Sequence, residues 1–235
     1  MNLDERINRL ETFHREGRLI RFEWVTEEED GRECACPLSA FSPEVGVEMN
    51  ARACPEEAMP MWLARLTPDI NDEVSVGAWE GFIARYIAVL PKLLRLPPER
   101  LARLDYATRA IAVRESRRYE TVKAALAEID AILLLIDRAA EGVAVSEEEW
   151  AAARAAGQYR LDCARAAAKG ADYDCSTYES IPMTAASWAA NEATRSRVPS
   201  TATAVEYRRV IEEVWGRMTE KFLTLWENAC KETQS

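Results

Sequence analysis

The sequence contains little of what flexible, fibrous or membrane-spanning proteins need. Its 235 residues include only nine glycines and ten prolines, while apolar residues make up 48% and charged residues 30%. This composition excludes disordered, collagen-like and low-complexity classes. The longest apolar run, AILLLI at residues 131–136, is far shorter than the roughly 18 to 20 residues that cross a bilayer. We therefore expect a globular protein with no membrane partner.

Signals for export are also lacking. The N-terminal segment MNLDERINRLETFHREG is charged throughout and has no apolar core of the kind found in a secretory signal. We therefore expect a cytoplasmic protein. Its six cysteines are then expected to be reduced thiols, because cytosolic reductants keep them so.

Familiar catalytic motifs are missing as well. The sequence has no G-x-x-x-x-G-K-[ST], no G-x-G-x-x-G and no G-x-S-x-G, so it lacks the common phosphate-binding and nucleophile signatures. Its single histidine, His14, leaves few ways to build a nucleophile activated by a histidine base. The sequence thus predicts no catalytic residue and no cofactor.

Negative charge is what the sequence has in excess. The net charge is -10, and residues 1–60 contribute -7 of it, with 14 acidic and 7 basic residues. This balance argues against a general nucleic-acid binder, which neutralises phosphates with a basic face. It favours a basic protein partner instead.

Helical periodicity dominates the chain and predicts a mainly α fold, a compact bundle of about seven to eight helices forming a single domain over residues 1–235. Gly142 is expected to end one helix, and the capping box of Ser146 and Glu149 to begin the next. The expected helices cover residues 3–16, 55–66, 76–96, 97–119, 121–142, 147–169, 183–196 and 202–232, with a loop at 170–182.

A β-hairpin at about residues 19–38 is expected after the first helix. Two alternating runs flank the turn residues Asp30 and Gly31, a pair typical of tight hairpin turns. The residues expected to share one face on each run are Ile20, Phe22 and Trp24, then Cys34, Cys36 and Leu38.

The cysteines of this region allow two interpretations. Cys34, Cys36, Cys54 and His14 could supply four zinc ligands, but the second close pair typical of structural zinc sites is missing. Alternatively, residues two apart on a strand share a face, so Cys34 and Cys36 would form an apolar stripe. The second interpretation is favoured. Cys175, in the polar stretch DYDCSTYES, is the thiol expected to be accessible.

Five acidic residues crowd the predicted hairpin tip: Glu27, Glu28, Glu29, Asp30 and Glu33. Charges there can simply protect the edge of a short sheet. They can also form an acidic finger that engages a basic groove, since such electrostatics supply association rate and specificity.

A basic stretch offers the opposite chemistry. Arg114, Arg117 and Arg118 fall at helical spacing beside Tyr119, a combination that can bind phosphate or carboxylate. The alternative is a solvated helix face with internal ion pairs.

Several segments together resemble a group of uncharacterised proteins that recur in bacteriophages and prophages. The likeness covers residues 17–156 and rests on GRLIRFEW, DGRECACPLSAFSPE, CPEEAMPMWLARLTPDIND, RLDYATRAIAVRE and IDRAAEGVAVSEEEWAAARAA. The resemblance implies no site residue. It implies a setting in the host cytoplasm in which small acidic proteins resemble inhibitors of host defence, including anti-CRISPR proteins.

We therefore expect a non-enzymatic, phage-type protein that binds and inhibits a host nucleic-acid-handling complex by contacting a basic subunit, without binding nucleic acid directly. Two alternatives stay open. One is a metal-dependent or thiol enzyme that uses Cys34, Cys36, Cys54 or Cys175, and the other is a virion structural or assembly protein.

Overall fold

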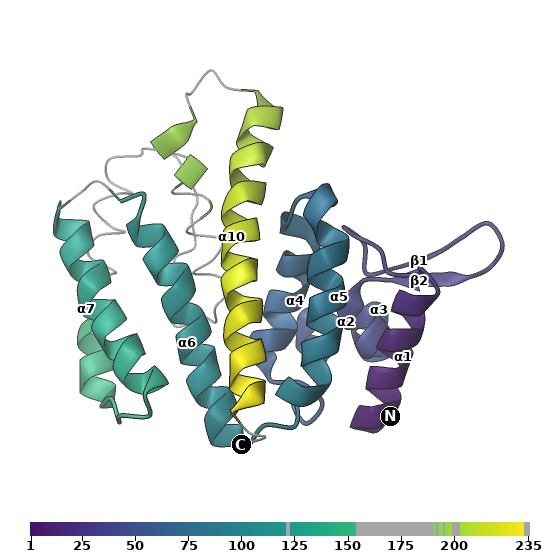
Figure 1. Ribbon diagram of the computed structural model, residues 1–235, viewed down its shortest axis with the longest axis horizontal. Coiled ribbons are helices and arrows are strands. Elements are labelled where there is room, and N and C mark those ends of the chain that lie inside the picture. The colour runs from purple at the N-terminus through teal and green to yellow at the C-terminus, as the bar shows by residue number, and fades with distance from the viewer. Residues whose placement is uncertain (121–122, 154–189, 191–192, 195, 199–202, 233–235) are drawn as a thin grey trace. The chain divides into compact units, whose positions relative to one another are not determined.

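The computed structural model describes residues 1–120, 123–153, 190, 193–194, 196–198 and 203–232 (Figure 1). The fold is mainly α with one small antiparallel sheet near the N-terminus, as predicted. The chain divides into two compact units. Unit 1 comprises Met1–Leu101 and Trp215–Ser235, and unit 2 comprises Ala102–Val214. The expectation of one domain over the whole chain stays a prediction.

Unit 1 holds the sheet and most of the described helices. Its core surrounds Trp226, whose ring centroid lies 6.0 Å from that of Trp62, 6.4 Å from Tyr86 and 6.1 Å from Phe222. The elements are α1 (Leu3–Arg15), β1 (Val25–Glu27), β2 (Glu33–Ala35), α2 (Pro37–Phe41), α3 (Pro43–Glu48), η1 (Ala51–Ala53), α4 (Met61–Glu73), α5 (Val76–Leu93) and the C-terminal part of α10 (Ala204–Lys231).

The first helix forms where the sequence predicts it. Asn2 and Glu5 make a reciprocal capping box at its N-terminus, which satisfies two backbone donors that a helix end otherwise leaves unpaired. The apolar residues Ile7, Leu10 and Phe13 recur at helical spacing and are all buried. The helix therefore stabilises unit 1 through one face.

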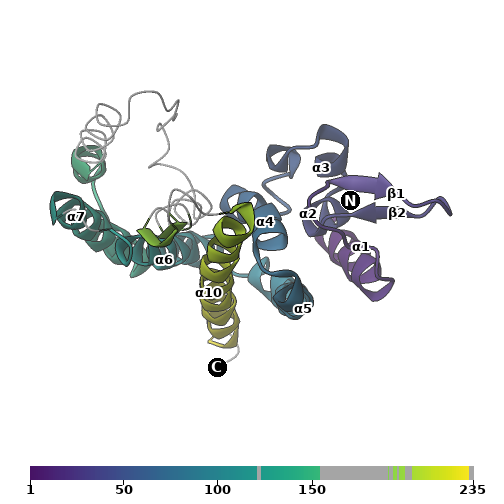
Figure 2. The ribbon, with the colours of Figure 1, turned by 90° about the horizontal axis from the view of Figure 1, so that it is seen from above.

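The hairpin is present but shorter than predicted. Val25 pairs with Ala35, and Glu27 with Glu33, in an antiparallel register. Gly31 adopts a φ of +80° in the turn, a conformation that glycine enters without steric cost. Figure 2 shows the two strands between α1 and α3, with the loop extending away from them.

Extension of the first strand back to Ile20 was wrong. Phe22 has a φ of +67° and its side chain is 62% exposed, so the expected alternation breaks there. Arg21 donates hydrogen bonds to the carbonyls of Asn71 and Val74 at the end of α4, and the Phe22 N–H donates to Asp72. These contacts tie the start of the hairpin to α4, which explains why this backbone leaves the strand conformation.

Extension of the second strand to Leu38 was also wrong. The strand ends at Ala35, and Cys36 caps α2, its Sγ accepting from the Ser39 N–H at 3.4 Å. Pro37 occupies the first turn of this helix, where its missing N–H does no harm. Cys34, Cys36 and Leu38 are all buried, but they lie on different elements and do not form a stripe on one strand.

The predicted boundaries of α4 were wrong. The helix was expected over residues 55–66, but it begins at Met61, just after Pro60, and continues through Pro68 to Glu73. In α5, Pro91 likewise lies inside the helix, which ends two residues later at Leu93. A proline removes one intrahelical hydrogen bond, and burial of the neighbouring apolar residues offsets that loss.

Unit 2 contains most of α6 (Pro98–Arg117) and all of α7 (Lys123–Ala140). The helix at 147–153 begins with the predicted capping box, since the Glu149 N–H donates to Ser146 Oγ and the Ser146 N–H to Glu149. The ring of Trp150 stacks on that of Tyr106 at 5.9 Å. The expected loop at 170–182, nearly all of the helix at 183–196 and the later part of the helix at 147–169 lie outside the described residues.

Candidate functional site

The acidic tip, defined as residues 27–33, is anchored at its base by contacts with other residues of unit 1. Ala35 in β2 exchanges backbone hydrogen bonds with the segment before β1, donating to the Arg18 carbonyl and accepting from the Ile20 N–H. Arg9 of α1 forms an ion pair with Glu33 at 2.6 Å and also donates to the Ser39 carbonyl of α2. The base of the acidic tip is thus connected to two helices.

Hydrogen bonds within the tip fix its shape. The Glu28 N–H donates to the Arg32 carbonyl, and the Gly31 N–H donates to the Glu28 carbonyl, each at 2.9 Å. The Arg32 guanidinium contacts Asp30 at 2.6 Å and Glu28 at 2.7 Å. Hydrogen bonds from the Arg32 backbone and side chain lower the pKa of Asp30, so this carboxylate remains charged.

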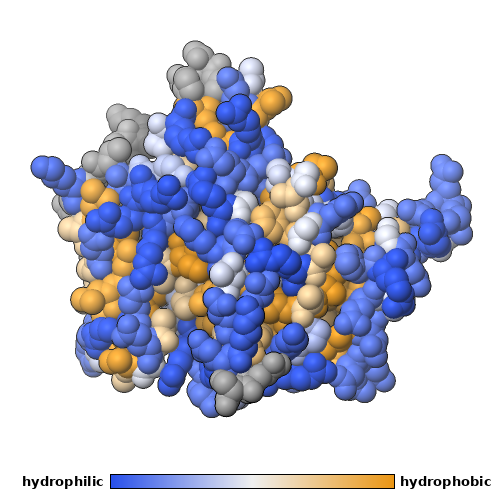
Figure 3. Space-filling model, viewed as in Figure 1, coloured by the Kyte–Doolittle hydropathy of each residue, from blue (hydrophilic) through white to orange (hydrophobic). Residues whose placement is uncertain are grey.

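The remaining acidic residues of the tip differ in their pairing. Glu33 is paired with Arg9, whereas Glu27 and Glu29 make no ion pair with any residue that the structure describes. Both side chains are exposed. Figure 3 shows the loop as a hydrophilic projection. The acidic tip therefore presents two exposed carboxylates that form no ion pair within the described part of the chain, on a loop held in place by internal ion pairs.

The cysteines near the hairpin base are not arranged as a metal centre. Cys34, Cys36 and Cys54 are free and buried, and His14 lies on the exposed side of α1. Within the described ranges, no three histidine, cysteine or acidic side chains are grouped closely enough to hold a metal ion. The structure therefore does not bring the four sequence candidates together.

Burial also makes these thiols poor nucleophiles. It raises the pKa of Cys34 and of Cys36, and it raises the pKa of Cys54 to about 11. Because the thiolate is the reactive form, each of the three is inert near neutral pH. Cys175, the other thiol considered from the sequence, lies outside the described residues.

The three arginines proposed as an anion site are each occupied by a different carboxylate. Arg114 pairs with Asp137 at 2.6 Å, Arg117 with Asp130 at 2.5 Å and Arg118 with Glu115 at 3.1 Å. The first two pairs join α6 to α7. The geometry matches the alternative stated from the sequence, a helix face with internal ion pairs, and the guanidinium groups do not converge on a common point.

Asp69 is a titratable residue that the sequence analysis missed. Its Oδ2 atom is buried in α4 and has no hydrogen-bond partner among the described residues. Burial, with smaller contributions from the carboxylates of Glu73 and Asp72, raises the pKa of Asp69 to about 7. An available signal was its position three and seven residues after the buried Leu66 and Trp62, which places an acid on an apolar helix face.

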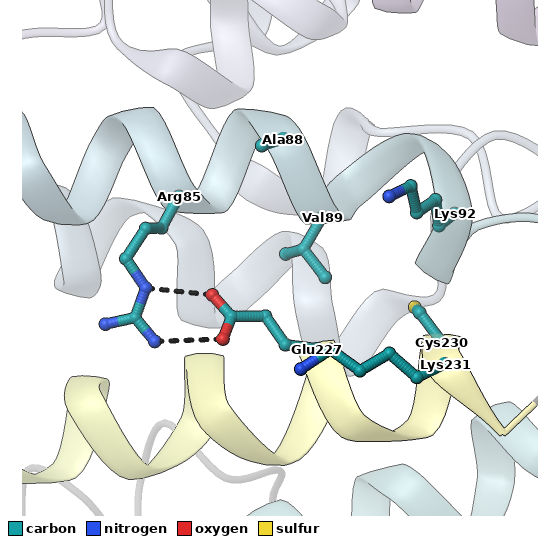
Figure 4. Close-up of a pocket in the computed structure, with 7 residues that line it drawn as sticks. All are labelled: Arg85, Ala88, Val89, Lys92, Glu227, Cys230 and Lys231. Atoms are coloured by element: carbon teal, nitrogen blue, oxygen red, sulfur yellow. Dashed lines mark hydrogen bonds and ion pairs between the residues drawn. The ribbon is translucent and has the colours of Figure 1, made fainter.

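A basic groove between α5 and the C-terminal turn of α10 was also missed (Figure 4). Its volume is about 170 Å³, and it is lined by Arg85, Ala88, Val89, Lys92, Glu227, Cys230 and Lys231. The lining residues of α5 recur at helical spacing, as do those of α10, so the sequence predicts that each set shares one helix face. The pairing of two segments about 140 residues apart was not.

Comparison with known proteins adds no identification. No protein-family model matches the chain, and neither a curated protein nor a solved structure matches it. Among the residues that the structure describes, no helix is both long and apolar enough to cross a membrane.

Proposed function

We propose that this chain is a non-enzymatic binding protein that engages a basic surface of another protein through its acidic tip. The observation that carries the proposal is that Glu27 and Glu29 are exposed and form no ion pair among the described residues, at a tip fixed by Arg32 and anchored by Arg9. A loop whose shape is already fixed by internal contacts loses less conformational entropy on association.

The charge of the acidic tip supports a partner surface of positive charge. The acidic tip contains five acidic residues and one basic residue, in a chain of net charge -10. Charges of one sign on a projecting element steer a partner of opposite charge and increase the association rate, an effect that falls as salt rises. A protein surface that normally holds RNA or DNA provides such a basic partner.

The class of partner we propose is therefore a basic subunit of a host nucleic-acid-handling complex, such as a CRISPR-like defence complex, and the proposed outcome is inhibition. The resemblance of residues 17–156 to phage and prophage proteins supports this setting. Occupation of the nucleic-acid groove by the acidic tip would compete with phosphate binding, because both ligands use the same cationic side chains.

Affinity capture from host lysate at low salt tests the proposal. Three baits are compared: the unchanged chain, the tip variant Glu27→Lys/Glu29→Lys, and the control Glu11→Lys/Glu141→Lys. The control changes net charge by the same amount at exposed residues that make no ion pair within the described ranges. We expect a basic nucleic-acid-binding protein to be retained by the unchanged chain and the control, and lost by the tip variant.

Two results would count against the proposal. Recovery of no partner at low salt would undermine the binding function itself. Equal recovery by the tip variant and the control would remove the acidic tip from the interaction, even if a partner exists.

A further inference from the structure

We propose that the basic groove between α5 and α10 is a binding site for a small organic anion, one that carries a carboxylate or phosphate on a compact apolar body. This site is distinct from the acidic tip and does not depend on the proposed protein partner. The shape of the groove, the composition of its floor and the placement of its charges all favour such a ligand.

The groove has an apolar floor and charged ends. Val89 is buried, and Ala88 lies beside it one residue earlier on α5. Cys230 of α10 contributes its thiol at the end where Lys92 lies, and the side chain of Lys231 extends from that end toward Glu227 (Figure 4). The volume of about 170 Å³ is comparable with the roughly 150 Å³ that accommodates one benzene ring in an engineered cavity. A ligand body of about that size fits the floor.

An ion pair closes the other end. Arg85 Nε contacts Glu227 Oε1 at 2.8 Å, a second guanidinium nitrogen contacts Oε2 at 3.2 Å, and the third reaches Glu220 at 2.6 Å. The carboxylate of Glu227 is therefore already neutralised by a bidentate partner. The charge of Lys231, four residues later on the same helix, also lowers the pKa of Glu227, whereas Lys92 lies on the facing helix α5.

The charge of Lys92 is left available, and that of Lys231 is only partly offset by Glu227. Both are exposed, and neither forms an ion pair with a residue in the described part of the chain. The lining residues carry three cations and one carboxylate, and Glu220 adds a second carboxylate through Arg85, so the groove keeps a small excess of positive charge within a protein of net charge -10. This local excess of positive charge favours an anion at the end of the groove where Lys92 lies.

The thiol of Cys230 lies in the positive field of nearby basic residues but does not neutralise it. The charges of Lys92 and Arg100 favour its thiolate, but burial outweighs them and raises the pKa of the thiol. The thiol is therefore protonated near neutral pH and brings no negative charge to the lysines. An external anion can do so.

The groove favours an anionic ligand with an apolar body but does not distinguish a carboxylate from a phosphate. Lysine ammonium groups act as flexible point charges, without the planar fork by which arginine recognises one oxyanion geometry. Carboxylate and phosphate are therefore both accepted at this end, while the floor favours an apolar group attached to either.

Titration by NMR tests the site directly, with the methyl signals of Ala88 and Val89 as reporters. The probes are phenyl phosphate, phenylacetate, inorganic phosphate and the neutral benzyl alcohol, each up to roughly 20 mM, a range suited to millimolar affinities. We expect saturable shifts with phenyl phosphate, phenylacetate or both, and weaker binding of inorganic phosphate and of benzyl alcohol. The relative affinities of the first two identify the preferred charged group.

A matched pair of variants separates the groove from general electrostatics. Lys92→Gln/Lys231→Gln removes the two local charges, and Arg52→Gln/Lys123→Gln removes two exposed charges elsewhere. We expect the first variant to weaken binding about tenfold or more and the second to leave it unchanged. The proposal is overturned if the organic anions cause no saturable shift, if benzyl alcohol binds as well as they do, or if both variants bind alike.

Discussion

Asp69→Asn should stabilise the protein at alkaline pH far more than at acidic pH. Folding raises the pKa of this carboxyl from its usual 3.8 to about 7, mainly through burial. A carboxyl whose folded pKa is raised favours the folded state below its unfolded pKa, and that contribution is lost as pH rises through the folded pKa. Asparagine does not titrate, so it removes this dependence.

The magnitude follows from linkage. A shift of about three units corresponds to a ceiling of about 4 kcal/mol once Asp69 is ionised in both states. Between pH 5 and pH 8.5, the same relation gives a change of up to about 3 kcal/mol in the free energy of unfolding. The residue is only partly buried, so solvent screening reduces the expected change to about 1 to 2 kcal/mol.

Urea denaturation followed by circular dichroism at several pH values provides the assay. The useful quantity is the difference between Asp69→Asn and the unchanged chain, because pH effects from other carboxyls are common to both proteins. We expect this difference to grow in favour of the variant as pH rises from 5 to 8.5. A constant difference, or one that favours the unchanged chain at high pH, would refute the reasoning.

Other substitutions test packing and pairing in unit 1. Arg6→Met should destabilise the protein by about 1 to 3 kcal/mol, because Arg6 is buried. Arg6 also lowers the pKa of Glu44 to about 2, which contributes stability above pH 4.5 that is lost as pH falls toward 2. The variant should therefore lose less stability than the unchanged chain between pH 4.5 and pH 2, as measured by denaturation at several pH values. Gly46→Ala should lower the thermal midpoint, since its Cβ would lie 2.6 Å from Val25 Cγ2, and adding Val25→Ala should restore part of the loss. The added Cβ of Gly216→Ala meets no atom within 4 Å, so this variant should raise the free energy of unfolding measured by urea denaturation by about 0.5 to 1 kcal/mol. A destabilising Gly216→Ala, or a harmless Gly46→Ala, would contradict these contacts.

The sequence predicted correctly those elements that are determined by residues close to one another along the chain. The first helix follows from its capping residues and from the spacing of Ile7, Leu10 and Phe13, all of which are buried. The turn at Gly31 follows from a conformation that other residues rarely adopt. Such features need no knowledge of tertiary contacts.

Tertiary contacts explain the errors. Phe22 leaves the strand because Arg21 is held by carbonyls at the end of α4, about 50 residues away. Helix α4 continues through Pro68 because burial of its apolar face offsets the free energy lost with one intrahelical hydrogen bond. Neither feature produces a local pattern, so alternation and helical periodicity alone gave the wrong boundaries.

The candidate sites divide in the same way. The acidic tip was visible because its residues are adjacent in the sequence, although the pairing of Arg32 with Glu28 and Asp30 was not foreseen. The basic groove joins Lys92 to Lys231, and such a juxtaposition exists only after folding. Sites assembled from distant helices are therefore the ones that sequence patterns miss.

The association rate of a purified partner tests the central proposal most directly. It would be measured against ionic strength for the unchanged chain, for Glu27→Lys/Glu29→Lys and for the control Glu11→Lys/Glu141→Lys. We predict a rate that falls as salt rises for the unchanged chain and the control, and a rate lower by about tenfold at low salt for the tip variant. Equal rates for the two variants at every ionic strength would show that the acidic tip does not direct binding.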